Sequence, residues 1–99
     1  MVKTIVHTVQ PISVVLFGSY ATGTIRDDSD IDFLVVERES FCANRSRWNE
    51  IKRLRQALRP FKGSKDILVY SDAEVQQLRT SANHLVGKAF RQGKVLYES

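Results

Sequence analysis

Residues 29–36 read Ser-Asp-Ile-Asp-Phe-Leu-Val-Val, with two aspartates at the head of an apolar run. Because successive side chains of a β-strand point to opposite faces, Asp30 and Asp32 should project from the same face. Two carboxylates held this close repel each other, and a divalent cation removes that cost. The segment therefore predicts a strand that presents metal-binding carboxylates at its start, although an isolated Asp-x-Asp is also typical of a solvated strand end.

A glycine and a serine end the preceding apolar run, residues 12–17. Without a Cβ, Gly18 lets the backbone approach a phosphate closely, and the hydroxyl of Ser19 adds a hydrogen-bond donor. Taken alone, the pair is equally typical of a plain turn. Ten residues separate Ser19 from Asp30, so the two segments together indicate a triphosphate site next to metal-binding carboxylates.

Three apolar runs rich in β-branched or aromatic residues predict the strands of a small sheet: 12–17, 31–36 and 66–70. The third run begins with Asp66, which is a candidate for a third metal ligand. The segment that contains Pro11 reads as a short helix or an arm. Residues 95–97 read as an edge strand or a packed tail.

Helices are expected after the second and third strands. Apolar residues recur at three- and four-residue steps, the spacing of one helical face: Trp48, Ile51, Leu54 and Leu58. Pro60 stops this run, and the place of Trp48 in it predicts a core side chain. Ser71 and Glu74 form a capping-box pattern that starts another helix, and a further helix should end at Gly93.

The 99 residues are enough for one compact domain, 1–99, and the 42% of hydrophobic and 26% of charged residues are typical of a globular protein. No stretch approaches the ~20 apolar residues that span a bilayer, and the N-terminal residues do not resemble a secretory leader. We therefore expect a cytoplasmic protein that does not bind a membrane. The single cysteine, Cys42, cannot form an internal disulfide.

The formal net charge of +4 is unevenly distributed. Residues 26–39 hold six of the eleven acids, whereas residues 45–65 hold eight of the fifteen basic residues and one acid, Glu50. An acidic centre beside a basic flank suits metal ions and phosphate. Three nearby cations could neutralise a triphosphate, although a solvated surface position is the more ordinary interpretation for each: Arg26, Lys62 and Lys65. The basic run also has the composition of a nucleic-acid surface, but no binding motif accompanies it, so we do not expect nucleic-acid binding.

Together these segments resemble the DNA polymerase beta-like nucleotidyltransferase superfamily, whose signature is Gly-Ser, a spacer of about ten residues and Asp-x-Asp between apolar flanks. The closer resemblance is to the minimal nucleotidyltransferases, the MNT family, in residues 16–23, 29–36 and 93–98. It implies an α/β (α+β) fold with a small mixed sheet and helices mainly on one face. Thr22 stands where the family commonly has arginine, which removes one cation near the phosphates.

The resemblance implies a role for each motif residue: triphosphate binding for Gly18 and Ser19, and coordination of two Mg²⁺ ions by Asp30, Asp32 and Asp66. Asp66 would also act on the attacking hydroxyl group. Asp72 competes with Asp66 for the third position, although its place beside Ser71 reads better as a helix start.

The implied reaction is Mg²⁺-dependent transfer of AMP from ATP to an acceptor hydroxyl. Members of the MNT family act beside helical HEPN proteins as antitoxins of toxin–antitoxin pairs, so the resemblance implies a heteromer with such a protein, which carries the acceptor. Phe90, Leu96 and Tyr97 are candidate anchors for it, and their packing in the domain's own core is the competing expectation. A second hypothesis is a catalytically weak nucleotide-binding module that neutralises its partner by binding alone.

Overall fold

The computed structural model describes residues 2–17, 31–61, 65–80 and 84–99. These residues form eight elements in the order α1 (Val2–Val9), β1 (Ser13–Phe17), β2 (Ile31–Glu37), α3 (Arg47–Ala57), β3 (Lys65–Ser71), α4 (Asp72–Leu78), α5 (Leu85–Gln92) and β4 (Lys94–Glu98). None of the helices in these ranges is long and apolar enough to cross a membrane.

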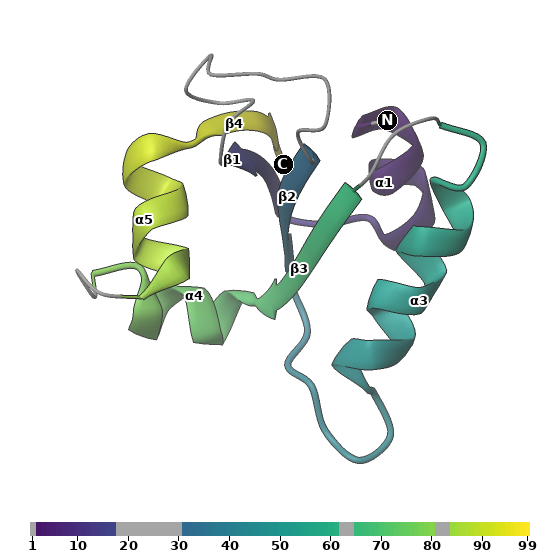
Figure 1. Ribbon diagram of the computed structural model, residues 1–99. Helices are drawn as coiled ribbons and strands as arrows, with labels where there is room; N and C mark the ends of the chain where they lie inside the picture. Colours follow the sequence, from purple (N-terminus) through teal and green to yellow (C-terminus); the bar gives the residue numbers. More distant parts are fainter. Residues whose placement is uncertain (1, 18–30, 62–64, 81–83) are drawn as a thin grey trace.

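The four strands form one mixed sheet with the order β3-β2-β1-β4 (Figure 1). β1 is antiparallel to both of its neighbours, β2 and β4, whereas β2 and β3 are parallel. The expected α/β fold with a small mixed sheet is therefore confirmed. The segment before Pro11 is the helix α1, and residues 95–97 belong to the edge strand β4.

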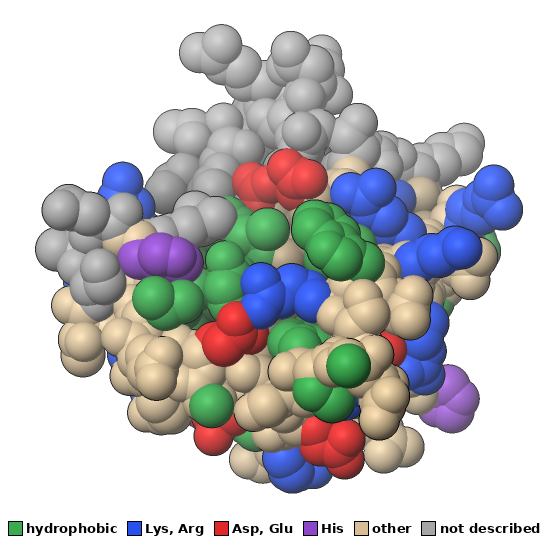
Figure 2. All heavy atoms as spheres, turned by 90° about the horizontal axis from the view of Figure 1, so that it is seen from below, with side chains coloured by type: hydrophobic (Ala, Val, Ile, Leu, Met, Phe, Trp, Pro, Cys, Tyr) green, Lys and Arg blue, Asp and Glu red, His purple; other side chains and the backbone are tan. Residues whose placement is uncertain are grey.

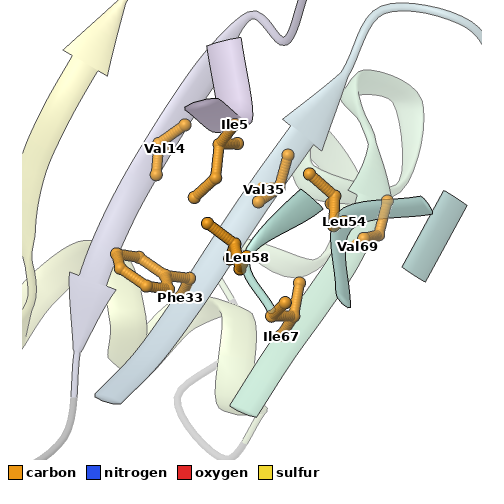
Figure 3. Close-up of a cluster of buried hydrophobic side chains, with 8 residues drawn as sticks. All are labelled: Ile5, Val14, Phe33, Val35, Leu54, Leu58, Ile67 and Val69. Carbon is orange, nitrogen blue, oxygen red and sulfur yellow. The ribbon is translucent and has the colours of Figure 1, made fainter. Parts of the chain in front are cut away.

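Helices cover both faces of the sheet, with α1 and α3 on one side and α4 and α5 on the other (Figure 1). Under α1 and α3, the buried side chains point toward one another (Figure 3): Ile5, Val14, Phe33, Val35, Leu54, Leu58, Ile67 and Val69. Under α4 and α5, a second cluster is buried: Val15, Leu34, Val36, Val75, Val86 and Ala89.

The two clusters correct the expectation that the helices lie mainly on one face. In β2, Phe33 and Val35 enter the first cluster, whereas Leu34 and Val36 enter the second. All four side chains are at most 2% exposed. A strand that is apolar on both sides needs a covering layer on each, and one layer of helices cannot supply both.

The prediction that Trp48 lies in the core is wrong, because its side chain is 75% exposed. Each residue of an α-helix turns by about 100°, so two successive three-residue steps place Trp48 about 120° away from the buried Leu54. Trp48 lies in the first turn of α3, where its N–H donates to the hydroxyl of the N-cap residue Ser46 at 3.2 Å. The buried stripe of α3 therefore begins after Trp48.

The candidate partner anchors are half-buried and pack on the domain's own core. Phe90 packs against the cluster under α4 and α5, and the guanidinium of Arg79 lies 4.8 Å from the centre of its ring. Leu96 and Tyr97 pack against the cluster under α1 and α3. This arrangement favours the core-packing alternative for all three side chains.

A buried ionic cluster ties the end of β2 to the following loop and to α3. Glu37, the last residue of β2, is 3% exposed and accepts a 3.0 Å hydrogen bond from Nη2 of Arg45. Arg45 Nη1 also donates to Glu50 at 3.1 Å, and Arg53 Nη1 donates to Glu50 at 3.0 Å. Burial and the hydrogen bond to Glu50 raise the pKa of Glu37 to about 7, although Arg45 acts in the opposite direction.

This raised pKa predicts a pH-dependent stability. Glu37 prefers its protonated form in the folded state, so its contribution is complete below the unfolded pKa of 4.5 and is lost as the pH rises through about 7. The free energy of unfolding should fall by at most about 3 kcal/mol between about pH 5 and pH 8, as measured by urea denaturation. Glu37→Gln should flatten this fall, and Glu39→Gln, at a mostly exposed side chain, should retain it. An unchanged slope in Glu37→Gln would contradict the assignment.

Gly93 ends α5 as predicted, but for a different physical reason. Its backbone is extended, with φ −83° and ψ 177°, which any residue can adopt. A Cβ at this position would lie 2.3 Å from the carbonyl oxygen of Ala89 and 2.7 Å from that of Leu16. The close approach of α5 to β1, rather than a left-handed conformation, therefore requires glycine here.

Gly93→Ala should lower the free energy of unfolding by about 1–3 kcal/mol, because the backbone atoms that it meets cannot move aside as a side chain can. Thermal and urea denaturation would measure the loss. Gln92→Ala, at the neighbouring exposed position, is the control and should change stability by less than about 0.5 kcal/mol. Equal stabilities for Gly93→Ala and Gln92→Ala would refute this explanation.

Candidate active site

Asp32 and Asp66 are direct neighbours across the parallel pair β2 and β3. Each is the second residue of its strand, and neighbouring strands lie about 4.8 Å apart. In register, their side chains project from the same face of the sheet. Two residues that are distant in the sequence thus form one pair of carboxylates.

Asp66, Asp32 and Phe17 form a row across the neighbouring strands β3, β2 and β1, because Phe17 is the partner of Asp32 on its other side. The predicted phosphate-binding residues Gly18 and Ser19 follow Phe17 in the sequence and lie outside the described residues, as do Asp30 and Thr22. Two described residues border on Asp32: Phe17, which is paired with it, and Ile31, which precedes it in β2.

The carboxylate pair lies on the side of the sheet that carries α4 and α5. In β2 and β3, side chains alternate between the faces, and Leu34 and Leu68, two residues after each aspartate, belong to the cluster on that side. Asp66 is exposed and Asp32 is half-buried, so a ligand can reach the pair.

The chemistry of this pair fits a divalent cation. Carboxylate oxygens are the ligands that Mg²⁺ prefers, and a cation between two adjacent carboxylates removes their mutual repulsion. Within the described ranges no group of three potential ligands occurs. Asp32 and Asp66 are the described members of the predicted triad.

Asp72, the alternative third carboxylate, lies at the far end of β3. It is the first residue of α4, six residues after Asp66 and hence about 20 Å further along the strand direction. Its carboxylate accepts a 3.3 Å hydrogen bond from the amide of Gln76. Ser71 and Glu74 form the predicted capping box around it. The structure thus brings Asp66, and not Asp72, next to Asp32.

Of the three cations considered for triphosphate binding, Lys65 is the one within the described residues, since Arg26 and Lys62 lie outside them. Lys65 precedes Asp66 and so points to the opposite face, where its ammonium donates to the backbone carbonyl of Phe61. It does not share a face with the carboxylate pair.

Three residues that the sequence did not single out lie along the face of the carboxylates. Tyr70 follows Asp66 at the two-residue period of β3, and the ring of His84 meets it edge to face with the ring centres 6.1 Å apart. The guanidinium of Arg47 lies 5.0 Å from the centre of the same ring and is paired with Glu74. The strand period from Asp66 could have indicated Tyr70, whereas the contacts of Arg47 and His84 depend on tertiary structure.

His84 also has a local structural role as the N-cap of α5. Its Nδ1 accepts a 3.1 Å hydrogen bond from the backbone N–H of Val86. A ring nitrogen that accepts from the backbone is unprotonated, so the tautomer with a proton on Nε2 is the one that fits.

Comparisons with known proteins agree with this geometry. Residues 1–99 match the model of a family described as Polymerase beta, Nucleotidyltransferase. No curated protein matches the sequence. Among solved structures, a toxin–antitoxin crystal structure with AMP-PNP shares 26% identity, with a TM-score of 0.57, and the match covers 99% of this chain and 70% of that chain.

Two further structures are similar in fold. A candidate nucleotidyltransferase from Sulfolobus solfataricus has a TM-score of 0.63 at 18% identity, over 98% of this chain and 73% of that chain. A tri-AMPylated HEPN toxin from Shewanella oneidensis in complex with an MNT antitoxin gives a TM-score of 0.55 at 23% identity, over 99% of this chain and 66% of that chain.

The geometry predicts that the carboxylates bind Mg²⁺ as a unit. Mg²⁺ should raise the melting temperature of the parent protein, because a ligand that binds the folded state stabilises it. Asp66→Asn should abolish most of this rise, and Asp72→Asn should retain it, as measured by calorimetry with and without the metal. A rise that survives Asp66→Asn and disappears in Asp72→Asn would move the third ligand to Asp72.

Proposed function

The chain belongs to the polymerase beta nucleotidyltransferase family, and on that premise we propose that it transfers AMP from ATP to a hydroxyl group of a partner protein. Two Mg²⁺ ions would be held by Asp30, Asp32 and Asp66. The observation that carries this proposal is that Asp66 lies beside Asp32 on one face of the sheet. Asp32 is in turn paired with Phe17, the last residue of β1, which the Gly-Ser motif follows in the sequence.

In this proposal the two substrates approach the carboxylates from different sides of the sheet, and the order of the strands supports that arrangement. Gly18 and Ser19 follow β1, so the triphosphate of the donor would lie on the β1 side. β3 is the edge strand at the other end of the sheet from β4, so the acceptor would approach from the side of Asp66. Asp32 on β2 lies between the two sides and would hold the reacting phosphate in position.

The acceptor oxygen forms a bond to the α-phosphorus while the bond from that phosphorus to the bridging oxygen of the β-phosphate breaks. Pyrophosphate leaves with the electron pair, and a carboxylate oxygen of Asp66 takes the acceptor's proton. Bound Mg²⁺ supplies charge neutralisation for the triphosphate and for the leaving group. The chain's own contribution is to position the two substrates and to hold the carboxylates in place.

The partner that we infer is a helical HEPN protein, with this chain as the antitoxin of the pair. Support comes from the structure that shares 26% identity, which is a toxin–antitoxin with AMP-PNP, an analogue of ATP. One of the structures similar in fold contains an AMPylated HEPN toxin. An acceptor on a separate protein also agrees with the exposure of Asp66.

The test is incubation of the chain with the protein encoded by the neighbouring gene, Mg²⁺ and α-labelled ATP. The label should appear on the partner, together with a mass increase of one or more AMP units. Asp66→Asn should lower the rate by roughly 100-fold or more, and Asp72→Asn should leave it within about twofold. Tight association without label, from a chain that binds Mg-ATP, would instead establish a module that neutralises its partner by binding alone.

A further inference from the structure

The exposed side of α3 carries a row of cations that starts at an exposed tryptophan. At about 100° per residue, Trp48, Lys52 and Arg55 lie within an arc of about 60° on the helix surface. Arg59 follows in the turn after the helix, and all four side chains are exposed. Figure 2 shows Lys and Arg side chains gathered on the side of the molecule that carries α3.

Among the residues that the structure describes, no acidic side chain is paired with this row of cations. Glu50, the acid within the segment 45–65, is 8% exposed and is held by Arg45 and Arg53. In the part of the chain that the structure describes, none of the cations Lys52, Arg55 and Arg59 forms an ion pair. The positive charge of the row is therefore available to an anionic ligand.

A pocket of about 360 Å³ lies at the C-terminal end of the row. Its walls combine three cations with apolar side chains: Arg55, Leu58, Arg59, Phe61, Lys65 and Ile67. The ring of Phe61 is 37% exposed. Arginines suit a phosphate, and an exposed ring offers a stacking surface to a base, so the pocket matches the chemistry of a nucleotide unit.

We propose that this face of α3 binds single-stranded nucleic acid, with the cations on the phosphate backbone and with bases stacked on Trp48 and Phe61. Cations flanked by an exposed aromatic ring at each end offer the two contacts that such binding combines, charge pairing with phosphates and stacking on bases. An acidic protein is the competing ligand class. A stable protein interface needs an apolar centre. Leu58 and Ile67 are only 2% and 4% exposed, so among the described residues of this face the accessible large apolar groups are the separate rings of Trp48 and Phe61.

The proposed surface is separate from the transferase site and goes beyond the proposed function. Lys65 and Ile67 point toward α3, whereas Asp66 between them points to the other side of the sheet. Nucleic acid bound along α3 would therefore leave the carboxylate pair accessible. The basic run alone did not lead us to expect nucleic-acid binding. The exposure of Trp48 changes this, because it adds a ring on which a base can stack.

Fluorescence anisotropy of labelled RNA and DNA single strands of about 20 nucleotides, titrated with the chain at low salt, tests the proposal. Both probes should bind, with an affinity that falls as the salt concentration rises. The probe that binds more tightly shows whether RNA or DNA is the preferred ligand. The double variant Arg55→Gln/Arg59→Gln should weaken binding about tenfold or more. Trp48→Ala should weaken it about fivefold without changing the salt dependence, because it removes stacking and no charge.

The matched control is Lys88→Gln/Lys94→Gln, which removes two exposed cations from α5 and β4 and should bind like the parent. All substituted side chains are exposed, so unchanged circular dichroism and melting temperature would verify folding. Absence of binding by the parent, or an equal loss in the control variant, would overturn the proposal. Competition by poly-glutamate at equal charge concentration would also overturn it, in favour of an acidic protein partner.

Discussion

The parallel pairing of β2 with β3 is the constraint on which the rest of the structure depends. Parallel strands cannot be joined by a tight hairpin, so the chain must cross over, and α3 makes that connection against one face of the sheet. The register of the pair places Asp66 beside Asp32. A shift by one residue would turn Asp66 toward α3 and Ile67 toward the carboxylate side. Sheet register therefore controls both the core and the site.

The two faces of β2 divide the molecule into a structural and a chemical side. Odd-numbered residues such as Phe33 and Val35 pack under α1 and α3, and this layer also receives the ionic cluster around Arg45. Even-numbered residues begin with Asp32 and continue into the cluster under α4 and α5. β2 thus supplies core contacts on both sides of the sheet, and its first even-numbered residue, Asp32, belongs to the candidate active site instead of the core. The basic surface of α3 lies on the opposite side from the carboxylates.

Local patterns in the sequence predicted the strands to within about a residue and the capping box of Ser71 and Glu74. Tertiary relations were beyond them. Periodicity shows that a helix has an apolar face but not which side of a sheet it covers. Two successive three-residue steps also add up to about 120°, so Trp48 fits the sequence pattern without lying on the buried face. The sequence favours Asp66 over Asp72 because Asp72 fits a helix start, and the pairing of β3 with β2 adds that Asp66 is the one beside Asp32. Gly18, Ser19 and Asp30 lie outside the described residues and remain predictions.

The position of β4 has a consequence for the order in which the protein is completed during synthesis. Ser13 of β1 is paired with Glu98 of β4, so the first and the last of the described strands are neighbours in the sheet. On the ribosome, β1 can pair with β2 early, but its outer edge stays open until β4 emerges. Contacts between distant segments form slowly, and unpaired edges invite aggregation. The strand that precedes the predicted phosphate-binding residues Gly18 and Ser19 is thus stabilised on both sides only after β4 has been synthesised.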